Sequence, residues 1–252
     1  MKLYRLFLVA LLPLLVLGIG IGGSPANAVI GGTDAPDGSL PFMASIQDPD
    51  GFAFCGGSVI SSTWVLTAAH CVAPGDNIYV VTGRENLDDS SEGQRIHVAA
   101  IHRHPAYDAA LLRLASATAS APIKLAATGA ADDALEAAGK TVTVAGWGDT
   151  LPTLGLFSTN QLQKTKLTMV GDPDCITNLG FDAPSELCAE ELAKDSCNGD
   201  SGGPLWGQRS GVKIQLGIVS YGTSCAAPGF PGVYAEVNNA SIRSWVKTTS
   251  GV

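Results

Sequence analysis

Short strand-like runs recur along most of this chain of 252 residues, and their spacing restricts its fold more than any other feature. Six runs form a first set and five form a second, with clusters of Gly, Pro, Asp and Asn between them. This spacing is typical of an all-β sandwich or barrel, and not of alternating strands and helices. The runs cover residues 42–47, 56–60, 64–67, 78–82, 95–101 and 109–114 in the first set, and 141–146, 162–170, 204–207, 213–221 and 233–237 in the second.

Two segments outside these runs have helical character. Residues 115–139, rich in alanine and small polar residues, are interpreted as the connection between two halves, with a helical turn at residues 130–138. Residues 238–249 carry Ile242, Trp245 and Val246 at helical spacing, and Asn239 or Ser241 can serve as the N-cap. A C-terminal helix is therefore the one helix that the sequence predicts clearly.

Residues 1–28 are predicted to be a secretory signal peptide. Lys2 and Arg5 precede an apolar run at residues 6–21, and the small residues 26–28, Ala-Asn-Ala, fit a cleavage site. The run is short for a membrane span, which needs about 20 apolar residues. We therefore expect a secreted, extracellular protein whose folded part is residues 29–252, with no membrane attachment after processing.

Cysteine count and charge restrict the function further. An even number of cysteines in an exported chain predicts three disulfides, and no pair has the spacing of a structural zinc site. Their connectivity is open from the sequence alone. The net charge of −8 favours cationic substrates and disfavours nucleic acid as a partner. The six are Cys55, Cys71, Cys175, Cys188, Cys197 and Cys225.

The run K-D-S-C-N-G-D-S-G-G-P at residues 194–204 combines several groups that can do chemistry. Ser201 is a candidate nucleophile, and the backbone N–H groups of Gly199 and Ser201 are candidate donors to an oxyanion. Asp195 precedes that serine by six residues and is a candidate for the floor of a binding pocket. The glycines allow a sharp turn and close approach to a substrate.

A hydroxyl needs an adjacent base to become a good nucleophile. His70, in T-A-A-H-C, follows an apolar strand and precedes Cys71, which can fix the backbone there. An imidazole base needs a partner that sets its tautomer, and Asp108 at the start of an apolar run is the candidate. Without the other motifs, an interpretation of Asp108 as a turn residue is equally good.

The order His70, Asp108, Ser201, together with T-A-A-H-C, G-D-S-G-G-P and A-G-W-G at residues 145–148, strongly resembles the trypsin/chymotrypsin-like serine endopeptidases. The resemblance covers residue 29 to the C-terminus. It implies two antiparallel six-stranded β-barrels, at about residues 29–120 and 137–237, with a helix at about 238–249 and the active site between the barrels. It also implies a Ser-His-Asp triad acting through an acyl-enzyme, and disulfides Cys55–Cys71, Cys175–Cys188 and Cys197–Cys225.

The same resemblance implies a substrate preference. Asp195 beside Ser196 would lie at the floor of the primary pocket, with glycines at both wall positions, so that the enzyme cleaves protein or peptide substrates after Arg or Lys. Ser220, Tyr221 and Gly222 would pair with the substrate main chain. The family usually has Trp in place of Tyr221. We expect a monomer without a cofactor, and the family allows protein inhibitors as partners. The two wall glycines are Gly222 and Gly232.

The start of the expected folded part matches the mature N-terminus of the family, Val29-Ile30-Gly31-Gly32. The freed ammonium group of Val29 would pair with Asp200. However, Ala28 stands where family zymogens usually have a basic residue. Two alternatives stay open: signal peptidase cuts after Ala28, or it cuts near residues 20–23 and leaves a short propeptide for another protease.

Other interpretations are weaker. His97, His102 and His104 are expected to be surface and turn residues, so that no metal site is predicted. In residues 84–94, where animal members of the family bind calcium, Arg84 replaces an acid, and the remaining acids are interpreted as a solvated charge run. An esterase of the α/β-hydrolase type would need a histidine after Ser201, and none follows. An inactive homologue that acts as a binding protein remains the alternative.

Overall fold

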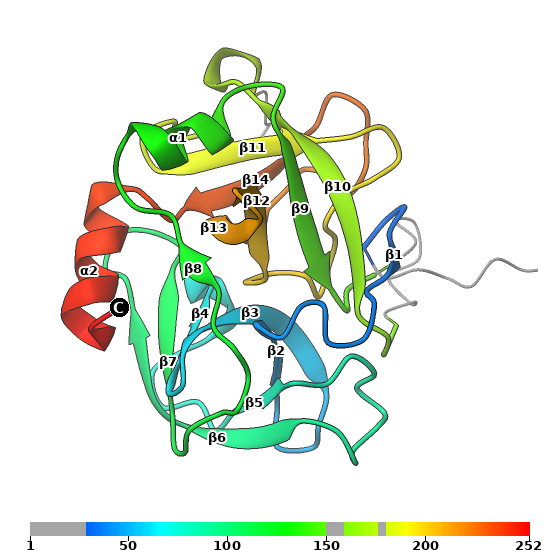
Figure 1. The fold of residues 1–252 in the computed structure, drawn as a ribbon, viewed down its shortest axis with the longest axis vertical. Helices are drawn as coiled ribbons and strands as arrows, with labels where there is room; N and C mark the ends of the chain where they lie inside the picture. The colour runs from blue at the N-terminus through cyan, green and yellow to red at the C-terminus, as the bar shows by residue number, and fades with distance from the viewer. Residues whose placement is uncertain (1–28, 150–158, 176–179) are drawn as a thin grey trace, which may run out of the picture.

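The computed structural model describes residues 29–149, 159–175 and 180–252. The predicted signal peptide, residues 1–28, lies outside the described residues. Figure 1 shows two bodies of β-strands, one above the other in this view, with the C-terminal helix at their side.

The first body is a closed barrel with strand order β2-β3-β4-β7-β6-β5, and all of its pairings are antiparallel. Apolar side chains fill its interior, among them Ile46, Val59 and Leu112, which are fully buried. Its strands are β2 (Met43–Gln47), β3 (Ala53–Ser61), β4 (Trp64–Thr67), β5 (Tyr79–Thr82), β6 (Gln94–Arg103) and β7 (Ala110–Leu114).

The second body closes in the same way, because β9 pairs with both β10 and β12 in the sequence of strands β9-β10-β11-β14-β13-β12. Two further short strands pair with strands of this barrel: β1 (Thr33–Asp34) pairs with β10, and β8 (Lys124–Leu125) runs parallel to β13. The six barrel strands are β9 (Thr141–Gly146), β10 (Gln163–Val170), β11 (Glu186–Glu190), β12 (Pro204–Arg209), β13 (Val212–Tyr221) and β14 (Gly232–Glu236).

The prediction of an all-β fold with two antiparallel six-stranded barrels and a C-terminal helix is confirmed. Every predicted run coincides with a strand to within a few residues. The run at β11 was not predicted, because residues 186–190 are E-L-C-A-E, with a charge at each end and little β-branched character. The strands β1 and β8 have two residues each, too few for an alternating pattern.

The helices are short. α1 (Ala130–Glu136) lies in the connection between the barrels, and α2 (Ala240–Ser250) ends the chain. Asn239 caps α2, since its side chain accepts hydrogen bonds from the N–H groups of Ser241 and Ile242. Gly251 ends α2 in the left-handed conformation, as is common for helices. Two 3₁₀ turns, η1 (Ala69–Cys71) and η2 (Asp172–Asp174), complete the elements.

A separate apolar cluster joins the two barrels to α2. Leu66 and Leu111 of the first barrel, Ile218 of the second, and Ile242 and Val246 of α2 all belong to it and are fully buried. This shared core holds the loops of the two barrels in a fixed relation. No helix among the described residues is long and apolar enough to span a membrane.

Candidate active site

His70 and Asp108 come together at the end of the first barrel that faces the second. His70 lies on η1 directly after β4, and Asp108 lies just before β7, the strand that pairs with β4. The ring Nδ1 of His70 is 2.7 Å from Oδ2 of Asp108, and the backbone N–H of His70 donates to Oδ1 at 2.9 Å. The carboxylate thus binds both the ring and the backbone of one residue, and leaves Nε2 directed away from it.

A third group holds the same carboxylate. The hydroxyl of Ser220, at the end of β13, donates to Oδ2 of Asp108 at 2.5 Å. Burial opposes ionisation of Asp108, but the hydrogen bonds from His70 and Ser220 outweigh it and lower the pKa of the carboxyl below its ordinary value. Because Ser220 belongs to the second barrel, this contact also ties the His70–Asp108 pair across the interface of the barrels. The sequence analysis assigned Ser220 to substrate binding and did not foresee this bond.

Ser201 belongs to a loop of the second barrel that lies against the first. Its carbonyl oxygen accepts a hydrogen bond from the N–H of Gly56 in β3 at 2.7 Å. Gly199 has φ of +90°, which favours glycine, and a Cβ there would lie 3.0 Å from Cα of Gly148. Within the described part of the chain, the N–H groups of Gly199 and Ser201 donate to no protein acceptor. The turn of this loop therefore offers two backbone N–H groups that no acceptor in the described residues engages.

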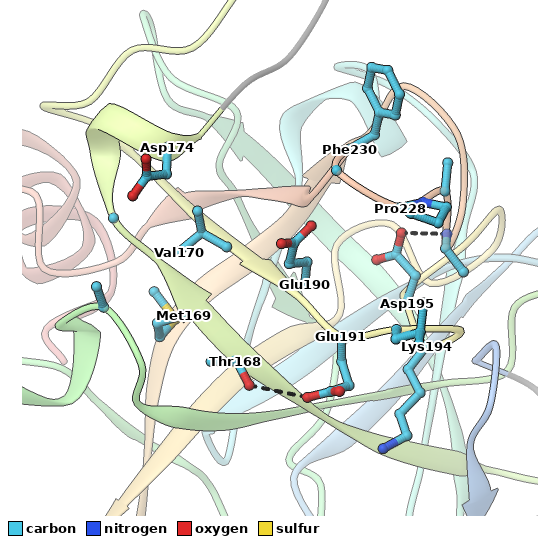
Figure 2. A pocket seen from close by; sticks show the side chains of 16 residues that line it. Thr168, Met169, Val170, Asp174, Glu190, Glu191, Lys194, Asp195, Pro228 and Phe230 are labelled. Atoms are coloured by element: carbon cyan, nitrogen blue, oxygen red, sulfur yellow. Dashed lines mark hydrogen bonds between the residues drawn. The ribbon is translucent and has the colours of Figure 1, made fainter.

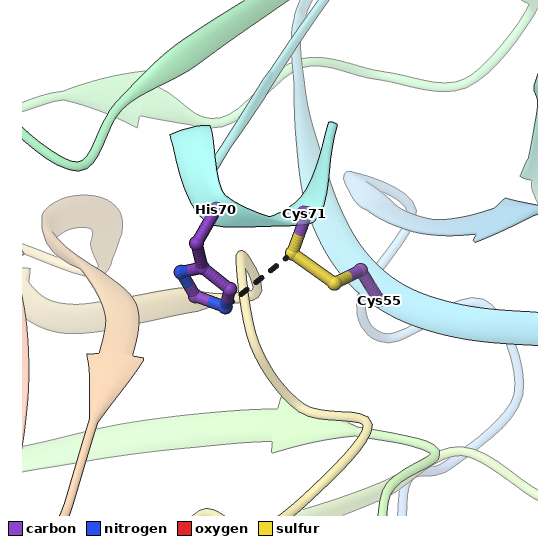
Figure 3. A group of neighbouring side chains, drawn as sticks. All are labelled: Cys55, His70 and Cys71. Atoms are coloured by element: carbon purple, nitrogen blue, oxygen red, sulfur yellow. Dashed lines mark hydrogen bonds between the residues drawn. A yellow bond between two sulfur atoms is a disulfide. The ribbon is translucent and has the colours of Figure 1, made fainter. Parts of the chain in front are cut away.

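The disulfide Cys55–Cys71 lies between the histidine and the serine loop. Sγ of Cys71 is 3.8 Å from Nε2 of His70, as Figure 3 shows, and 3.6 Å from the carbonyl oxygen of Ser201. In the described residues, no hydrogen bond joins the side chains of His70 and Ser201. Such contacts are often long in structures without a substrate and shorten when the substrate binds.

Cys55, His70 and Cys71 also bring three metal-ligand atom types within 4.8 Å of one another. However, both sulfur atoms are engaged in the disulfide, so neither is a thiolate that could bind a metal. The other disulfides join Cys175 to Cys188 and Cys197 to Cys225. These are the three pairs that the family resemblance implies.

Asp200 is fully buried in the second barrel. Its carboxylate accepts from the N–H groups of Gly148 and Cys197, both at 2.9 Å. Burial raises the pKa of this carboxyl to about 7, because these two bonds offset only part of the lost hydration. A Cβ on Gly148 would lie 2.6 Å from Cγ of Asp200, so the A-G-W-G run leaves room for this group. Val29 is also fully buried, against the interior of the same barrel.

A pocket of about 470 Å³ opens beside Ser201, and Asp195 lies in its wall. Asp195 is 5% exposed, and its Oδ2 accepts from the N–H of Ala226 at 2.9 Å. Its Oδ1 is buried and has no hydrogen-bond partner among the described residues. Burial raises the pKa of this carboxyl to about 6. A buried carboxylate oxygen without a partner is costly, and a cationic group placed beside it offsets that cost.

The walls of this pocket are open because of glycine. A Cβ on Gly232 would lie 2.9 Å from Oδ1 of Asp195 and 3.0 Å from the hydroxyl of Tyr234, while Gly222 faces Gly232 across the pocket. The hydroxyl of Ser196 lies 3.3 Å from that of Tyr234. Tyr234 is fully buried in the core of the second barrel, with its hydroxyl behind the pocket, a contact that sequence reasoning missed because a tyrosine in a strand is typically core.

Tyr221 lies at the end of β13 and lines the same pocket. Its hydroxyl donates to the carbonyl of Gly180 at 2.5 Å and lies 2.9 Å from Oε2 of Glu186. The ring is therefore held by the segment that leads into β11.

Asp195 also lines a second pocket on the other side of its segment. Figure 2 shows Glu190, Glu191 and Asp174 around this second pocket, with the Lys194 side chain extending away from Asp195. Glu190 adds to the upward shift in the pKa of Asp195, although burial is the larger cause. Acidic side chains therefore lie behind Asp195, on the side away from the pocket beside Ser201.

The histidines outside the site differ from one expectation. His104 is 7% exposed and stacks on Tyr107, with its Nδ1 accepting from the N–H groups of Ala106 and Tyr107. The interpretation of His104 as a surface residue was therefore wrong, because the bend after β6 turns its ring toward α2, where it contacts Trp245. His97 and His102 are exposed.

The loop at residues 84–94 is built around a side-chain cation. The guanidinium group of Arg84 donates to the carbonyl oxygens of Glu92 at 2.8 Å and Leu87 at 3.5 Å. Asp88 and Asp89 bond to groups of this region: Asp88 accepts from Asn160, and Asp89 accepts from Ser91. The guanidinium thus engages carbonyl oxygens of the loop that would otherwise be available to an ion.

The comparison with known proteins decides the family. The sequence model of the trypsin family matches residues 29–246. The chain belongs to the trypsin family. It is therefore a serine endopeptidase, as the sequence analysis predicted, and its substrates are proteins.

Curated trypsins resemble this trypsin-family chain over most of its length. It is 36% identical to Trypsin 5G1 of Aedes aegypti, over 94% of each chain. It is 36% identical to Trypsin-1 of Astacus astacus, over 88% of this chain and 100% of that one. Identity to Trypsin II-P29 of Gallus gallus is 35%, over 90% of this chain and 91% of the relative.

Proposed function

We propose that this chain is an exported endopeptidase that cleaves peptide bonds after Arg or Lys with His70, Asp108 and Ser201 as its catalytic residues. The observation that carries the specificity is the unpartnered Oδ1 of Asp195 in the pocket beside Ser201. A guanidinium or ammonium group of a substrate supplies the missing partner. A neutral side chain leaves the carboxylate buried and unpaired, so it binds much more weakly.

The proposed reaction begins at Ser201. Its Oγ attacks the carbonyl carbon of the scissile bond while Nε2 of His70 accepts the hydroxyl proton. The bond from Asp108 to Nδ1 fixes the tautomer that leaves Nε2 free to accept, and stabilises the imidazolium that forms. Collapse of the intermediate passes that proton to the leaving amine and leaves an acyl-enzyme, which water hydrolyses with His70 again as the base.

The negative charge of the tetrahedral intermediate needs donors that are already oriented. The N–H groups of Gly199 and Ser201 are proposed for this role, because no protein acceptor in the described residues engages them. Loss of one such donor typically lowers the rate by about 100-fold or more. Ser220, Tyr221 and Gly222 are proposed to pair with the substrate main chain from the end of β13.

The proposal includes processing and partners. Residues 1–28 direct export, and residues 29–252 act as a monomeric peptidase that protein inhibitors can bind. Removal of the leader frees the ammonium group of Val29 to pair with Asp200. Whether signal peptidase cuts after Ala28 or leaves a short propeptide is decided by the N-terminal sequence of the secreted protein.

The test is hydrolysis of fluorogenic peptides that differ only in the residue before the cleaved bond. We expect the mature protein to cleave after Arg and Lys, and Ser201→Ala to lower kcat by at least about 10⁴-fold. Asp195→Ser should lower kcat/KM for the Arg peptide by on the order of 10⁴-fold while leaving slow cleavage of neutral peptides. Full Arg activity in Asp195→Ser would refute the pocket assignment. Absence of any hydrolysis by the mature wild type would favour the binding-protein alternative.

A further inference from the structure

Four lysines line one pocket on the outer face of the second barrel. They are half of the eight lysines in the chain, although the net charge is −8. The pocket has a volume of about 530 Å³, within the range of sites for small ligands. No described residue that lines it is acidic. The four, called the lysine pocket below, are Lys164, Lys166, Lys194 and Lys213.

Their positions come from three separate parts of the fold. Lys164 and Lys166 are two residues apart on β10, so both point outward from the same face of the strand. Lys213 lies in β13, paired with Gln208 of β12, which also lines the pocket. Lys194 follows the turn after β11. The topology thus gathers positive charge from segments that are far apart in the sequence.

The ammonium groups of these lysines have no carboxylate partners in the described part of the chain. Across the described residues, none of the four lies within 4 Å of an acidic oxygen. The one hydrogen bond among them is from Nζ of Lys213 to the carbonyl oxygen of Ser39, at 3.3 Å. Three of the four are half-buried, and only Lys166 is exposed. Like charges held together in this way repel each other, and a multiply charged anion relieves that repulsion.

The lysine pocket is next to the segments that carry the active site. Lys194 directly precedes Asp195, and the N–H of Asp195 donates to the carbonyl oxygen of Ile30 at 3.2 Å. Gly31 lines the pocket, and a Cβ there would lie 2.8 Å from Cγ of Lys194, so the lysine stem packs on the backbone of this N-terminal segment. Lys194 also lines the acidic pocket with Glu190 and Glu191, and Figure 2 shows its side chain extending away from Asp195.

We propose that the lysine pocket binds a short polyanion carrying two or more sulfate or phosphate groups. The bound anion bridges Lys194 and the lysines of β10, and so holds residues 29–31 against the segment that leads to Asp195. Lysines act on such groups as point charges, and the hydroxyls of Thr141 and Thr143, which also line the pocket, can donate to the same oxygens. The ligand is short because the overall negative charge repels a long polyanion outside this pocket.

Binding is measured by calorimetry on the mature protein with two probes, a fully sulfated disaccharide and tripolyphosphate. We expect Lys164→Gln/Lys166→Gln to raise the dissociation constant of the probes at least tenfold. The matched control is Lys124→Gln/Lys247→Gln, which removes the same charge from exposed positions outside the pocket and should change it less than twofold. Thermal unfolding without ligand checks that both variants fold. Tighter binding of one probe identifies sulfate or phosphate as the source, and either result supports the proposal.

Three results overturn it: no binding of either probe, equal loss in the two double variants, or equally tight binding of a 20-base-pair DNA duplex. The last would indicate a general electrostatic surface. Sodium chloride added at the same ionic strength must not reproduce the heat of binding that the probes give. The bridging part has its own readout, because bound ligand should slow hydrogen exchange at the amide of Asp195. Unchanged exchange with proven binding refutes the bridge.

Discussion

At the scale of single residues, Asp195 combines two properties that pull in opposite directions. A cationic substrate needs the carboxyl ionised, yet burial raises its pKa to about 6. Hydrogen bonds from the N–H of Ala226 and from Ser196 lower the pKa and offset part of the effect of burial. The negative charge of Glu190 behind the pocket acts in the same direction as burial. The free enzyme therefore takes up a proton at this site under mildly acidic conditions, and under the proposed specificity this proton competes with a cationic substrate.

This competition predicts a pH-dependent specificity. Below pH about 6, the ratio of kcat/KM for an Arg peptide to that for a matched neutral peptide should fall, by up to about tenfold per pH unit. A protonation that slows both substrates equally cancels in the ratio. The measurement is the ratio from pH 4.5 to 8, with Asp195→Ser as the control whose ratio should stay flat. A constant ratio in the wild type would contradict the assignment of Asp195.

Ser220 shows how a single residue can join the two barrels. It is 8% exposed, and its hydroxyl contacts the carboxylate that orients His70. Because the hydroxyl donates to Asp108 from the second barrel, the orientation of the histidine depends on both barrels.

At the scale of elements, the short helix α1 is held by polar contacts and little apolar burial. Arg209 of β12 pairs with Asp132 at 2.7 Å, and the amide of Asn238 donates to Asp133 and Glu136, both at 3.0 Å. Burial, with the negative charge of Glu236 as the second cause, raises the pKa of Glu136 to about 8. Seven residues are too few for a stable isolated helix, so these contacts keep α1 in place.

The raised pKa of Glu136 predicts that stability falls as pH rises. The unfolded chain releases this proton near the ordinary pKa of 4.5, whereas the folded chain keeps it until about 8, so stability is lost across that window. Glu136→Gln should remove this part of the loss. We expect its Tm relative to wild type to increase from pH 5 to pH 8 and then level off, measured in a Ser201→Ala background that prevents self-digestion. The exposed Glu92→Gln serves as the matched control. A difference in Tm that is independent of pH would disprove the burial of this acid.

At the scale of the whole molecule, the chain enters the second barrel before it builds the first. Val29 is buried in that barrel, Ile30 bridges to Asp195, and β1 pairs with β10. Figure 1 shows this first segment beside β10, above the barrel that follows it in sequence. The start of the folded part is thereby coupled to the loop of residues 195–201, although more than 160 residues separate them.

This coupling predicts that activity depends on a free amino group at Val29. In the continuous chain, burial raises the pKa of Asp200 to about 7, and an ammonium group nearby would stabilise its ionised form. A protein that begins at Val29 should be at least tenfold more active than one that retains Ala28. Its activity should fall at alkaline pH as the ammonium group, with an ordinary pKa of about 7.7–8.0, deprotonates. Equal activity of the two forms would contradict this mechanism.

The sequence by itself determined the strands, the order of the candidate site residues and the family. Alternating apolar residues and turn residues act locally, so the runs that became β4 and β9 were visible with correct bounds. The motifs around His70 and Ser201 are short and contiguous, because their backbone conformation requires particular residues in a row. Local pattern fails for β11, where charged ends and a cysteine conceal a strand that both neighbours hydrogen-bond.

Only the tertiary structure decided which distant groups meet. The bond from Ser220 to Asp108, the position of Tyr234 beneath Gly232, the buried ring of His104 and the four lysines around one pocket each combine segments far apart in the chain. Barrel closure brings such segments together, because each strand must satisfy its hydrogen bonds with two neighbours. Those pairings are set by the burial of the whole interior, which no short stretch of sequence contains.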